Sequence, residues 1–364
     1  MKRLGISIYP EKTSKEELLE YIDRASYAGF SRIFSCLLSV VDDKEKIKKD
    51  FTYINEFAKS KGFEIIVDVA PSVFSKLGIT YNDLKFFKEI QADGFRLDEG
   101  FTGNEEALMT FNEYNLKVEI NASINVHTID TIMDYYPNKY NLYGCHNFYP
   151  HAYSGLALDY FDECTDRFKR YGLRTAAFVT SQNQNTFGPW PVTQGLVTLE
   201  MHRNLSLLTQ VKHYLSMGNI DDIIISNCYP SDDELEQFKD LDLRFVTFDV
   251  TVEDGVPELQ RRVMFEELHI NRGDVNSNMI RSTQPRIKYK GNKFELFNVP
   301  EIIKRGDIVI ESSEYGHYAG ELQIAKKDMK NTGFSNVVGK ITEEELFILD
   351  YLKPWQKFKL KISG

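Results

Sequence analysis

The sequence has little of what marks a disulfide-stabilised, membrane-spanning or nucleic-acid-binding protein. Its 364 residues include four cysteines and no Cys-x-x-Cys pair, which argues against a disulfide framework. No apolar run approaches the roughly 20 residues that a helix needs to cross a bilayer. Basic residues are the minority, 44 Lys and Arg against 54 Asp and Glu, whereas a general nucleic-acid binder needs a basic surface. We therefore expect neither a membrane nor a nucleic acid as a partner.

Signals for export and for nucleotide cofactors are also lacking. The amino terminus, MKRLGISIYPEK, reaches Glu11 and Lys12 before an apolar segment develops, so it does not resemble a signal peptide. Together with the unpaired cysteines, this predicts a cytoplasmic protein. The motifs GxGxxG, GxxxxGK[ST] and GxSxG are absent, so neither a nucleotide cofactor nor a serine hydrolase is supported. We expect no cofactor.

What the chain does contain, up to about residue 238, is an alternation of short apolar runs and amphipathic stretches. The eight candidate strands are LGISIYP, SRIFSCL, FEIIVDVAP, DGFRLDEG, KVEINAS, LYGCHNFYP, RTAAFVTS and DIIISNC. Helical stretches such as SKEELLEYIDRASYAGF end at a glycine, a usual helix stop. Eight strand–helix units in about 240 residues predict a (β/α)8 TIM barrel, with a doubly wound sheet as the alternative.

After about residue 240 the pattern changes to short alternating runs separated by turn residues. They are RFVTFDVTV, RVMFEELHI, RIKYK, FELFNV, GDIVIES, GELQIAK and NVVGKI. Such runs predict a small all-β domain. We therefore divide the chain into a barrel domain, residues 1–238, and a β domain, residues 239–364.

The alternation within the barrel strands predicts which side chains face the interior. Successive side chains of a strand point to opposite faces, and the apolar set of each strand packs against the surrounding helices. The opposite set then points inward: Ser7, Tyr9, Asp68, Arg96, Asp98, Glu119 and Asn121.

Three of these inward residues are acidic and lie on consecutive strands. Adjacent strands are about 4.8 Å apart, so the carboxylates of Asp68, Asp98 and Glu119 can lie about 5 to 9 Å apart, as in glycoside hydrolases. Burial and mutual repulsion raise the pKa of one carboxyl and create a general acid, while Arg96 keeps its partner ionised. The alternative is a salt-bridge network that fills the barrel. We predict that at least one of the three is catalytic.

Polar and aromatic residues also follow the later strands. In CHNFYPHAY, either His146 and Phe148 or Asn147 and Tyr149 face inward; a metal site at His146 and His151 would lack a clustered third ligand. A loop anchor or a solvated helix face is the alternative for the residues further along. We predict no metal site, and substrate-binding roles for His146, Asn147, Tyr149, Trp190, Glu200, His202 and Asn227.

The β domain offers one candidate site. The segment IRSTQPRIK places Arg281 and Arg286 close to two hydroxyl residues, a combination that suits an anion such as phosphate. The alternative is an exposed hairpin with ordinary surface arginines.

Several motifs together resemble one bacterial family, the 6-phospho-N-acetylmuramidases, formerly described as a domain of unknown function or "outer surface protein". They are RLDEGF, EINAS, CHNFYP, the GP…GL.TLE.HR stretch, IRSTQPR and YGHYAGELQIA, and they cover essentially the whole chain. The resemblance implies a TIM barrel followed by a cyclophilin-like domain. It also implies hydrolysis of 6-phospho-N-acetylmuramyl-N-acetylglucosamine, a small disaccharide phosphorylated during uptake, in peptidoglycan recycling.

Combined with strand parity, this resemblance suggests roles for the predicted residues. Asp98 and Glu119 form the acid/base and nucleophile pair, with Asp68 in reserve. Sugar contacts come from Asn121, Asn147, Tyr149, Glu200 and His202, and contacts to the 6-phosphate or lactyl carboxylate from Arg281 and Arg286. The retaining, inverting and substrate-assisted mechanisms all stay open.

Two other classes of function compete with this reading. A phosphosugar isomerase or lyase needs a base and usually a metal or a Schiff-base lysine, and no lysine is expected to face inward at a strand end. The protein is otherwise a non-catalytic carbohydrate binder, or a prolyl isomerase through its β domain.

Overall fold

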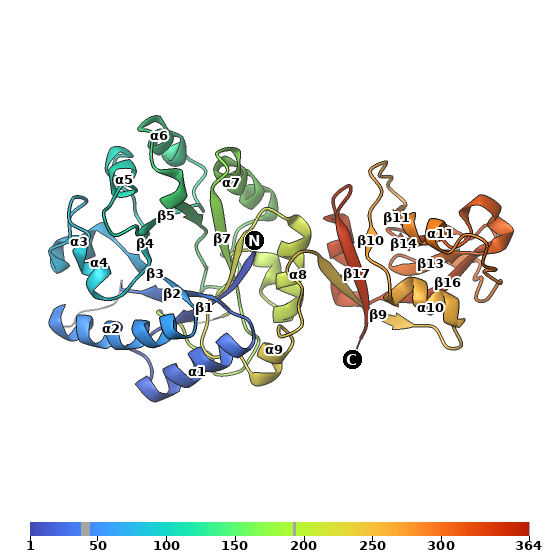
Figure 1. Ribbon diagram of the computed structural model, residues 1–364, viewed down its shortest axis with the longest axis horizontal. Coiled ribbons are helices and arrows are strands. Elements are labelled where there is room, and N and C mark those ends of the chain that lie inside the picture. The colour runs from blue at the N-terminus through green and yellow to red at the C-terminus, as the bar shows by residue number, and fades with distance from the viewer. Residues whose placement is uncertain (38–43, 192–193, 364) are drawn as a thin grey trace. The chain divides into compact units, whose positions relative to one another are not determined.

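The computed structural model describes residues 1–37, 44–191 and 194–363, and the chain divides into two units (Figure 1). One unit comprises Met1–Val211 with Gly218–Asp240, and the other comprises Lys212–Met217 with Leu241–Gly364.

The first unit is a closed barrel of eight parallel strands in sequential order. Strand β1 pairs with β2 on one side and with β8 on the other, where Ile6 is the partner of Ile225. This closure confirms the predicted (β/α)8 barrel and rules out the doubly wound sheet. The strands are β1 (Arg3–Ile8), β2 (Arg32–Cys36), β3 (Glu64–Val69), β4 (Gly94–Leu97), β5 (Lys117–Asn121), β6 (Leu142–Cys145), β7 (Arg174–Val179) and β8 (Asp222–Ile225).

Helices connect the strands and surround the barrel (Figure 1). The first begins at a capping box formed by Ser14 and Glu17, and it buries Leu18, Ile22 and Ala25, spaced three and four residues apart, as in an amphipathic helix. The helices of this region are α1 (Lys15–Tyr27), α2 (Lys44–Ser60), α3 (Pro71–Leu77), α4 (Lys85–Glu89), α5 (Asn104–Met109), α6 (Thr128–Asp134), α7 (Leu158–Arg170), α8 (Leu207–Met217), α9 (Asp232–Glu236), and the short 3-10 helices η1 (Lys139–Asn141) and η2 (Glu200–His202).

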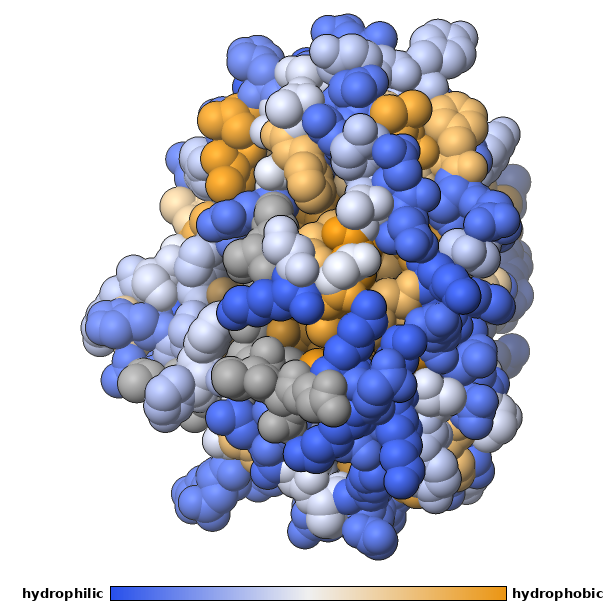
Figure 2. All heavy atoms as spheres, turned by 90° about the vertical axis from the view of Figure 1, so that its left-hand side faces the viewer, coloured by the Kyte–Doolittle hydropathy of each residue, from blue (hydrophilic) through white to orange (hydrophobic). Residues whose placement is uncertain are grey.

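One face of this unit is hollowed (Figure 2). Hydrophobic side chains are exposed in the middle of the hollow, and hydrophilic side chains border it. A concave surface of this mixed character is typical of small-molecule sites.

Charged residues fill the barrel interior at the amino ends of the strands. Asp222 begins β8, and its fully buried carboxylate accepts hydrogen bonds from Arg3, Arg32 and Arg174, which begin β1, β2 and β7. Burial alone would raise the pKa of Asp222, but the three guanidiniums hold it well below its usual range. The carboxylate therefore ties together the first residues of three strands.

The second unit is built on a seven-stranded sheet, so its mostly-β character is confirmed. The spatial order of its strands is β10-β17-β9-β16-β13-β14-β11, and all pairs are antiparallel except β17 with β9. The strands are β9 (Val246–Val252), β10 (His269–Ile270), β11 (Met279–Ser282), β13 (Asp307–Glu311), β14 (Leu322–Ala325), β16 (Ser335–Ile341) and β17 (Lys357–Ile362), with a separate pair β12 (Ile302–Ile303) and β15 (Met329–Lys330). A cyclophilin-like identity for this unit stays a prediction.

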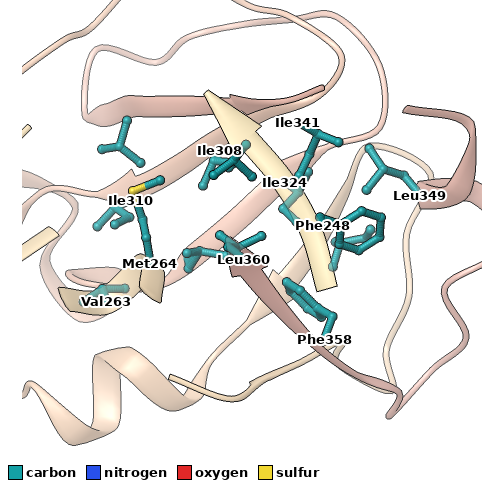
Figure 3. Packing of buried hydrophobic residues seen from close by; sticks show 14 of the residues in the cluster. Phe248, Val263, Met264, Ile308, Ile310, Ile324, Ile341, Leu349, Phe358 and Leu360 are labelled. Carbon is teal, nitrogen blue, oxygen red and sulfur yellow. The ribbon is translucent and has the colours of Figure 1, made fainter. Parts of the chain in front are cut away.

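The core of this unit lies on one face of the sheet. Alternate residues of its strands, such as Phe248, Ile308 and Ile324, are completely buried and lie close to Val263 and Met264 of α10 (Glu258–Phe265) (Figure 3). The remaining helices are α11 (Gln284–Lys288) and the 3-10 helices η3 (Ser313–Tyr318) and η4 (Glu343–Asp350).

Three of the runs that predicted strands in this unit have other structures. Most of RVMFEELHI belongs to helix α10 and the short β10, RIKYK falls largely in helix α11, and FELFNV has no regular structure. Short apolar runs do not distinguish a strand from a buried helix. Moreover, Pro285 lies at the start of α11, a position where proline favours a helix.

No helix among the described residues combines the length and the apolar character that crossing a bilayer requires.

The buried Asp222 cluster predicts a large stability effect. Replacing Asp222 with Asn leaves Arg32 without its full counter-charge, and the free energy of unfolding should fall by about 3 kcal/mol or more at pH 7. Because the pKa of Asp222 is lower in the folded protein than in the unfolded chain, this contribution is present above about pH 4 and is lost as the pH falls further. Urea unfolding across this pH range measures the difference.

The matched control is Asp232→Asn, which removes an exposed pair with Arg24 and should change stability by less than about 1 kcal/mol. Equal effects of the two substitutions would contradict a special role of the buried cluster.

Candidate active site at the barrel rim

Arg96 joins two carboxylates at the carboxyl ends of neighbouring strands. Its Nη1 atom donates to Oδ1 of Asp68 at 2.6 Å and to Oδ1 of Asp98 at 3.2 Å. The contact follows from the register, since Asp68 on β3 is the partner of Arg96 on β4 and Asp98 follows two residues later. Arg96 also donates through Nη2 to the side-chain oxygen of Asn147. All four residues were predicted to belong to the site, and the structure brings them together.

The two carboxylates differ in their surroundings. Asp68 is 4% exposed, whereas the side chain of Asp98 is 37% exposed. Burial raises the pKa of Asp68 to about 6, and the charge of Asp98 adds to this effect while Arg96 opposes it. One guanidinium shared by two acids neutralises only one of them. The pair therefore combines a carboxyl that is easily protonated with a more exposed one.

Glu119 points into the barrel as parity predicts, but it lies deeper. Its Oε1 atom accepts a hydrogen bond from Arg32, the arginine that also bonds Asp222, and both side chains of this pair have zero exposure. Glu119 is thus sealed in the interior and joined to the charged cluster at the amino ends of the strands. Asp68 and Asp98 are the acidic pair that shares the rim.

A chain of amide and hydroxyl contacts continues the rim from β5 to β6. Asn121 donates to the backbone oxygen of Asp98 at 3.3 Å and accepts from the backbone of Ser123 at 2.9 Å. The Ser123 hydroxyl in turn accepts from the backbone of Asn147 at 2.7 Å. These bonds position Asn121 and Asn147 beside the carboxylate pair.

After β6 the side chains do not follow either alternation that the sequence suggested. Asn147 contacts Arg96, and the next residue, Phe148, packs against Phe34 and Phe178 with ring centroids 6.1 and 5.0 Å apart. Both therefore face the barrel interior, because the strand ends at Cys145 and its strict alternation ends with it. The three rings provide an apolar surface next to the polar rim.

His146 points the other way, toward helix α7. Its Nε2 atom lies 2.9 Å from the hydroxyl of Thr165, and its ring packs on Phe161. Burial and the nearby Arg96 charge lower the pKa of His146 to about 3, so the imidazole is neutral. His146 is placed to support β6 rather than to contact a substrate.

Glu200 and Arg203 tie together the loops that follow β6 and β7. Glu200 accepts from the backbone of Tyr153 at 2.9 Å and of Gly155 at 2.7 Å, and it pairs with Arg203 at 2.6 Å. Arg203 donates to the backbone oxygen of Tyr149 at 3.2 Å. Hydrogen bonding to Arg203 lowers the pKa of Glu200, so its carboxylate is ionised and occupied. The pair fixes the backbone that carries Tyr149.

The remaining predicted residues of the barrel have varied surroundings. Ser7, Tyr9, His202 and Asn227 are almost completely buried. The Tyr9 hydroxyl donates to the backbone of Ser226, and the Asn227 amide makes two hydrogen bonds to the backbone of Ser181. Trp190, in contrast, is 42% exposed and has an accessible ring.

Sequence reasoning did not single out three residues that the structure brings to attention. Arg32 neutralises Glu119, Phe148 contributes to the apolar surface, and Glu99 is an exposed carboxylate directly after Asp98. The consecutive acids at the end of a strand were a visible signal for Glu99. The other two depend on contacts between strands that are distant in sequence.

Within the described residues no group of three or more His, Cys, Asp and Glu side chains could hold a metal ion.

In the second unit, Arg281 and Arg286 meet the same carboxylate. Arg281 Nε donates to Oε1 of Glu321 at 2.9 Å, and Nη1 of Arg286 lies 3.0 Å from Oε2. The two arginines are therefore close together, as the sequence suggested, around a buried counter-ion.

Comparisons with known proteins agree across the whole chain. Residues 4–240 match the family model described as "6-phospho-N-acetylmuramidase, N-terminal", and residues 246–361 match the model for the C-terminal part. No curated protein matches the sequence.

Two crystal structures are similar over their full length. An uncharacterized protein from B. cereus is 45% identical with a TM-score of 0.90, and the match covers 99% of this chain and 100% of that one. A conserved protein of unknown function from Enterococcus faecalis is 23% identical with a TM-score of 0.71, covering 100% of this chain and 97% of that one. The second likeness concerns the fold alone.

Proposed function

The chain belongs to the 6-phospho-N-acetylmuramidase family of glycosidases, and we propose that it hydrolyses 6-phospho-N-acetylmuramyl-N-acetylglucosamine in peptidoglycan recycling. The observation that supports this most is the pair of carboxyl groups, Asp68 and Asp98, bound to one nitrogen of Arg96. Glycosidases use such pairs at opposite sides of the scissile bond. A substrate phosphorylated during uptake implies that the protein acts in the cytoplasm.

Asp68 is the general acid in this proposal. A carboxyl group protonates the departing sugar only if it holds a proton near the working pH, and a pKa of about 6 meets that condition. Asp98 is the ionised partner, because it is more exposed and contacts the guanidinium of Arg96. It attacks the anomeric carbon, or it orients the N-acetyl group of the substrate for that attack.

Glu119 acts on this pair from below. Its carboxylate is sealed from solvent but is close enough to contribute to the raised pKa of Asp68. We therefore assign Glu119 a positioning role and move Asp68 from reserve to the catalytic pair.

Sugar recognition falls to the exposed and half-buried groups around the pair. Asn121 and Asn147 offer amides beside the carboxylates, and Tyr149 is held by the Arg203 contact to its backbone. Phe148 presents an apolar ring, and Trp190 an exposed one, on which a sugar face can pack.

The first test uses the disaccharide itself. Purified protein is incubated with 6-phospho-N-acetylmuramyl-N-acetylglucosamine and with its unphosphorylated form, and products are followed by mass spectrometry. We expect cleavage of the phosphorylated form only. Binding without product would instead identify a carbohydrate-binding protein, and an isomerised or eliminated sugar without hydrolysis would identify a different barrel enzyme.

The second test separates the two carboxylates by the leaving group. Asp68→Asn should lower kcat for the disaccharide by about 100-fold or more, but should affect an aryl glycoside of 6-phospho-N-acetylmuramic acid far less, because an activated phenolate needs no proton. Asp98→Asn should impair both substrates. In the wild-type enzyme, kcat/KM for the disaccharide should decline as the pH rises through about 6, where Asp68 loses its proton.

Asp166→Asn, an exposed acid on α7, is the matched control and should leave kcat unchanged. If folded Glu119→Gln lost turnover while Asp68→Asn kept it, Glu119 and not Asp68 would be the catalytic acid.

The third test concerns stereochemistry. The Oδ1 atoms of Asp68 and Asp98 contact one nitrogen at 2.6 and 3.2 Å, so they lie within about 6 Å of each other. Inverting glycosidases need about 6.5 to 9.5 Å between carboxyl groups to admit a water, whereas retaining enzymes need about 5 to 5.5 Å. Retention is therefore expected, whether Asp98 or the N-acetyl oxygen attacks. Proton NMR of the newly released muramyl sugar, before mutarotation, measures the outcome, and an inverted anomer would refute it.

A further inference from the structure

The second unit contains a cluster of charged groups that the barrel chemistry does not use. Arg281 on β11 and Arg286 on α11 share the carboxylate of Glu321, which has no exposure to solvent. The two arginine side chains are only 21% and 16% exposed. Two guanidiniums around one carboxylate leave one positive charge without a partner in the cluster.

Neighbouring acids do little to cancel that charge. Glu311 lies on the adjacent strand β13 and is 5% exposed, with its carboxylate bonded by the Ser335 hydroxyl at 2.7 Å. Burial raises the pKa of Glu311 to about 7, so near neutrality it carries only part of a charge. Asp274 is paired with Arg272 through two hydrogen bonds of 2.7 and 2.6 Å.

The guanidiniums also have donors to spare. Among the described residues, Arg281 donates only through Nε, and Arg286 contacts Glu321 without forming an aligned hydrogen bond. Arg286 is nevertheless fixed, because its guanidinium lies 5.2 Å from the ring centroid of Tyr318. Oriented arginines with unused N–H groups are suited to binding a carboxylate or phosphate through two hydrogen bonds.

Aromatic side chains lie beside this pair. Tyr318 is 39% exposed and Phe334 is 42% exposed, and Tyr315 joins them with ring centroids 5.7 and 5.6 Å away. Exposed rings next to an anion-binding group suit a molecule that combines a sugar ring with a negative charge.

We infer that Arg281 and Arg286, oriented by Glu321 and Tyr318, form a binding site in the second unit for an anionic sugar. The anion is a phosphate or a carboxylate, and both occur on the substrate of the proposed function, on which this choice of sugar rests. The site is separate from the carboxylate pair and recognises the charged group without taking part in bond cleavage.

The test compares three monosaccharides by isothermal titration calorimetry with the full-length protein. N-Acetylglucosamine 6-phosphate carries the phosphate, N-acetylmuramic acid carries the carboxylate, and N-acetylglucosamine carries neither. We expect at least one anionic sugar to bind more tightly than the neutral sugar. Arg286→Gln should raise the Kd of that anionic sugar at least tenfold and leave the Kd of N-acetylglucosamine unchanged.

Arg286→Gln keeps the hydrogen bond between Arg281 and Glu321, so we expect the variant to fold. Arg286→Lys, which keeps the charge but loses the planar fork, should have an intermediate Kd and serves if the glutamine variant is unstable. Arg262→Gln is the matched control, because Arg262 is an exposed arginine of the same unit, paired with Glu266 at 3.2 Å. Its Kd should equal that of the wild type.

A Kd for the anionic sugars that is unchanged in Arg286→Gln and Arg286→Lys would overturn the inference, as would equal binding of the neutral sugar. These outcomes are independent of the hydrolysis assay, because none of the three sugars has a glycosidic bond. Loss of binding in a protein that does not hydrolyse the disaccharide would refute only the proposed function. Hydrolysis with no effect of the arginine variants on binding would refute only the anion site.

Discussion

The candidate active site depends on one guanidinium shared by two carboxylates. Arg96 compensates for one negative charge, while Asp68 and Asp98 supply two. Burial then decides which of them gives up its charge more easily, and Asp68 is the more buried. The asymmetry that acid–base chemistry needs thus arises from the depth of two otherwise identical side chains on neighbouring strands.

The same barrel interior uses buried charge for stability at its other end. Asp222 is surrounded by Arg3, Arg32 and Arg174, so its negative charge is fully compensated and its pKa is lowered. Glu119 lies between the two ends and shares Arg32 with this cluster. Charges of the interior are therefore fully paired at the amino ends of the strands and incompletely paired at the rim. This agrees with the general separation in TIM barrels of a stabilising face from a catalytic face.

The second unit repeats the rim's principle with the signs reversed. There, two arginines share one buried carboxylate, so the excess charge is positive. In both units a group whose charge is only partly compensated lies next to accessible aromatic or amide side chains. Such places are where a ligand of opposite charge or a proton is most strongly bound.

The sequence by itself determined the eight-stranded barrel, the change to β structure near residue 240, and the inward direction of Asp68, Arg96, Asp98 and Glu119. These follow from hydrophobic periodicity, which is a local property of the chain. Only the tertiary structure decided that Asp68 and not Glu119 shares the rim with Asp98, because the depth of a side chain depends on register and on partners such as Arg32 from another strand. The directions of His146 and Phe148, and the helices in place of strands in RVMFEELHI and RIKYK, were likewise decided by packing against elements far away in the sequence.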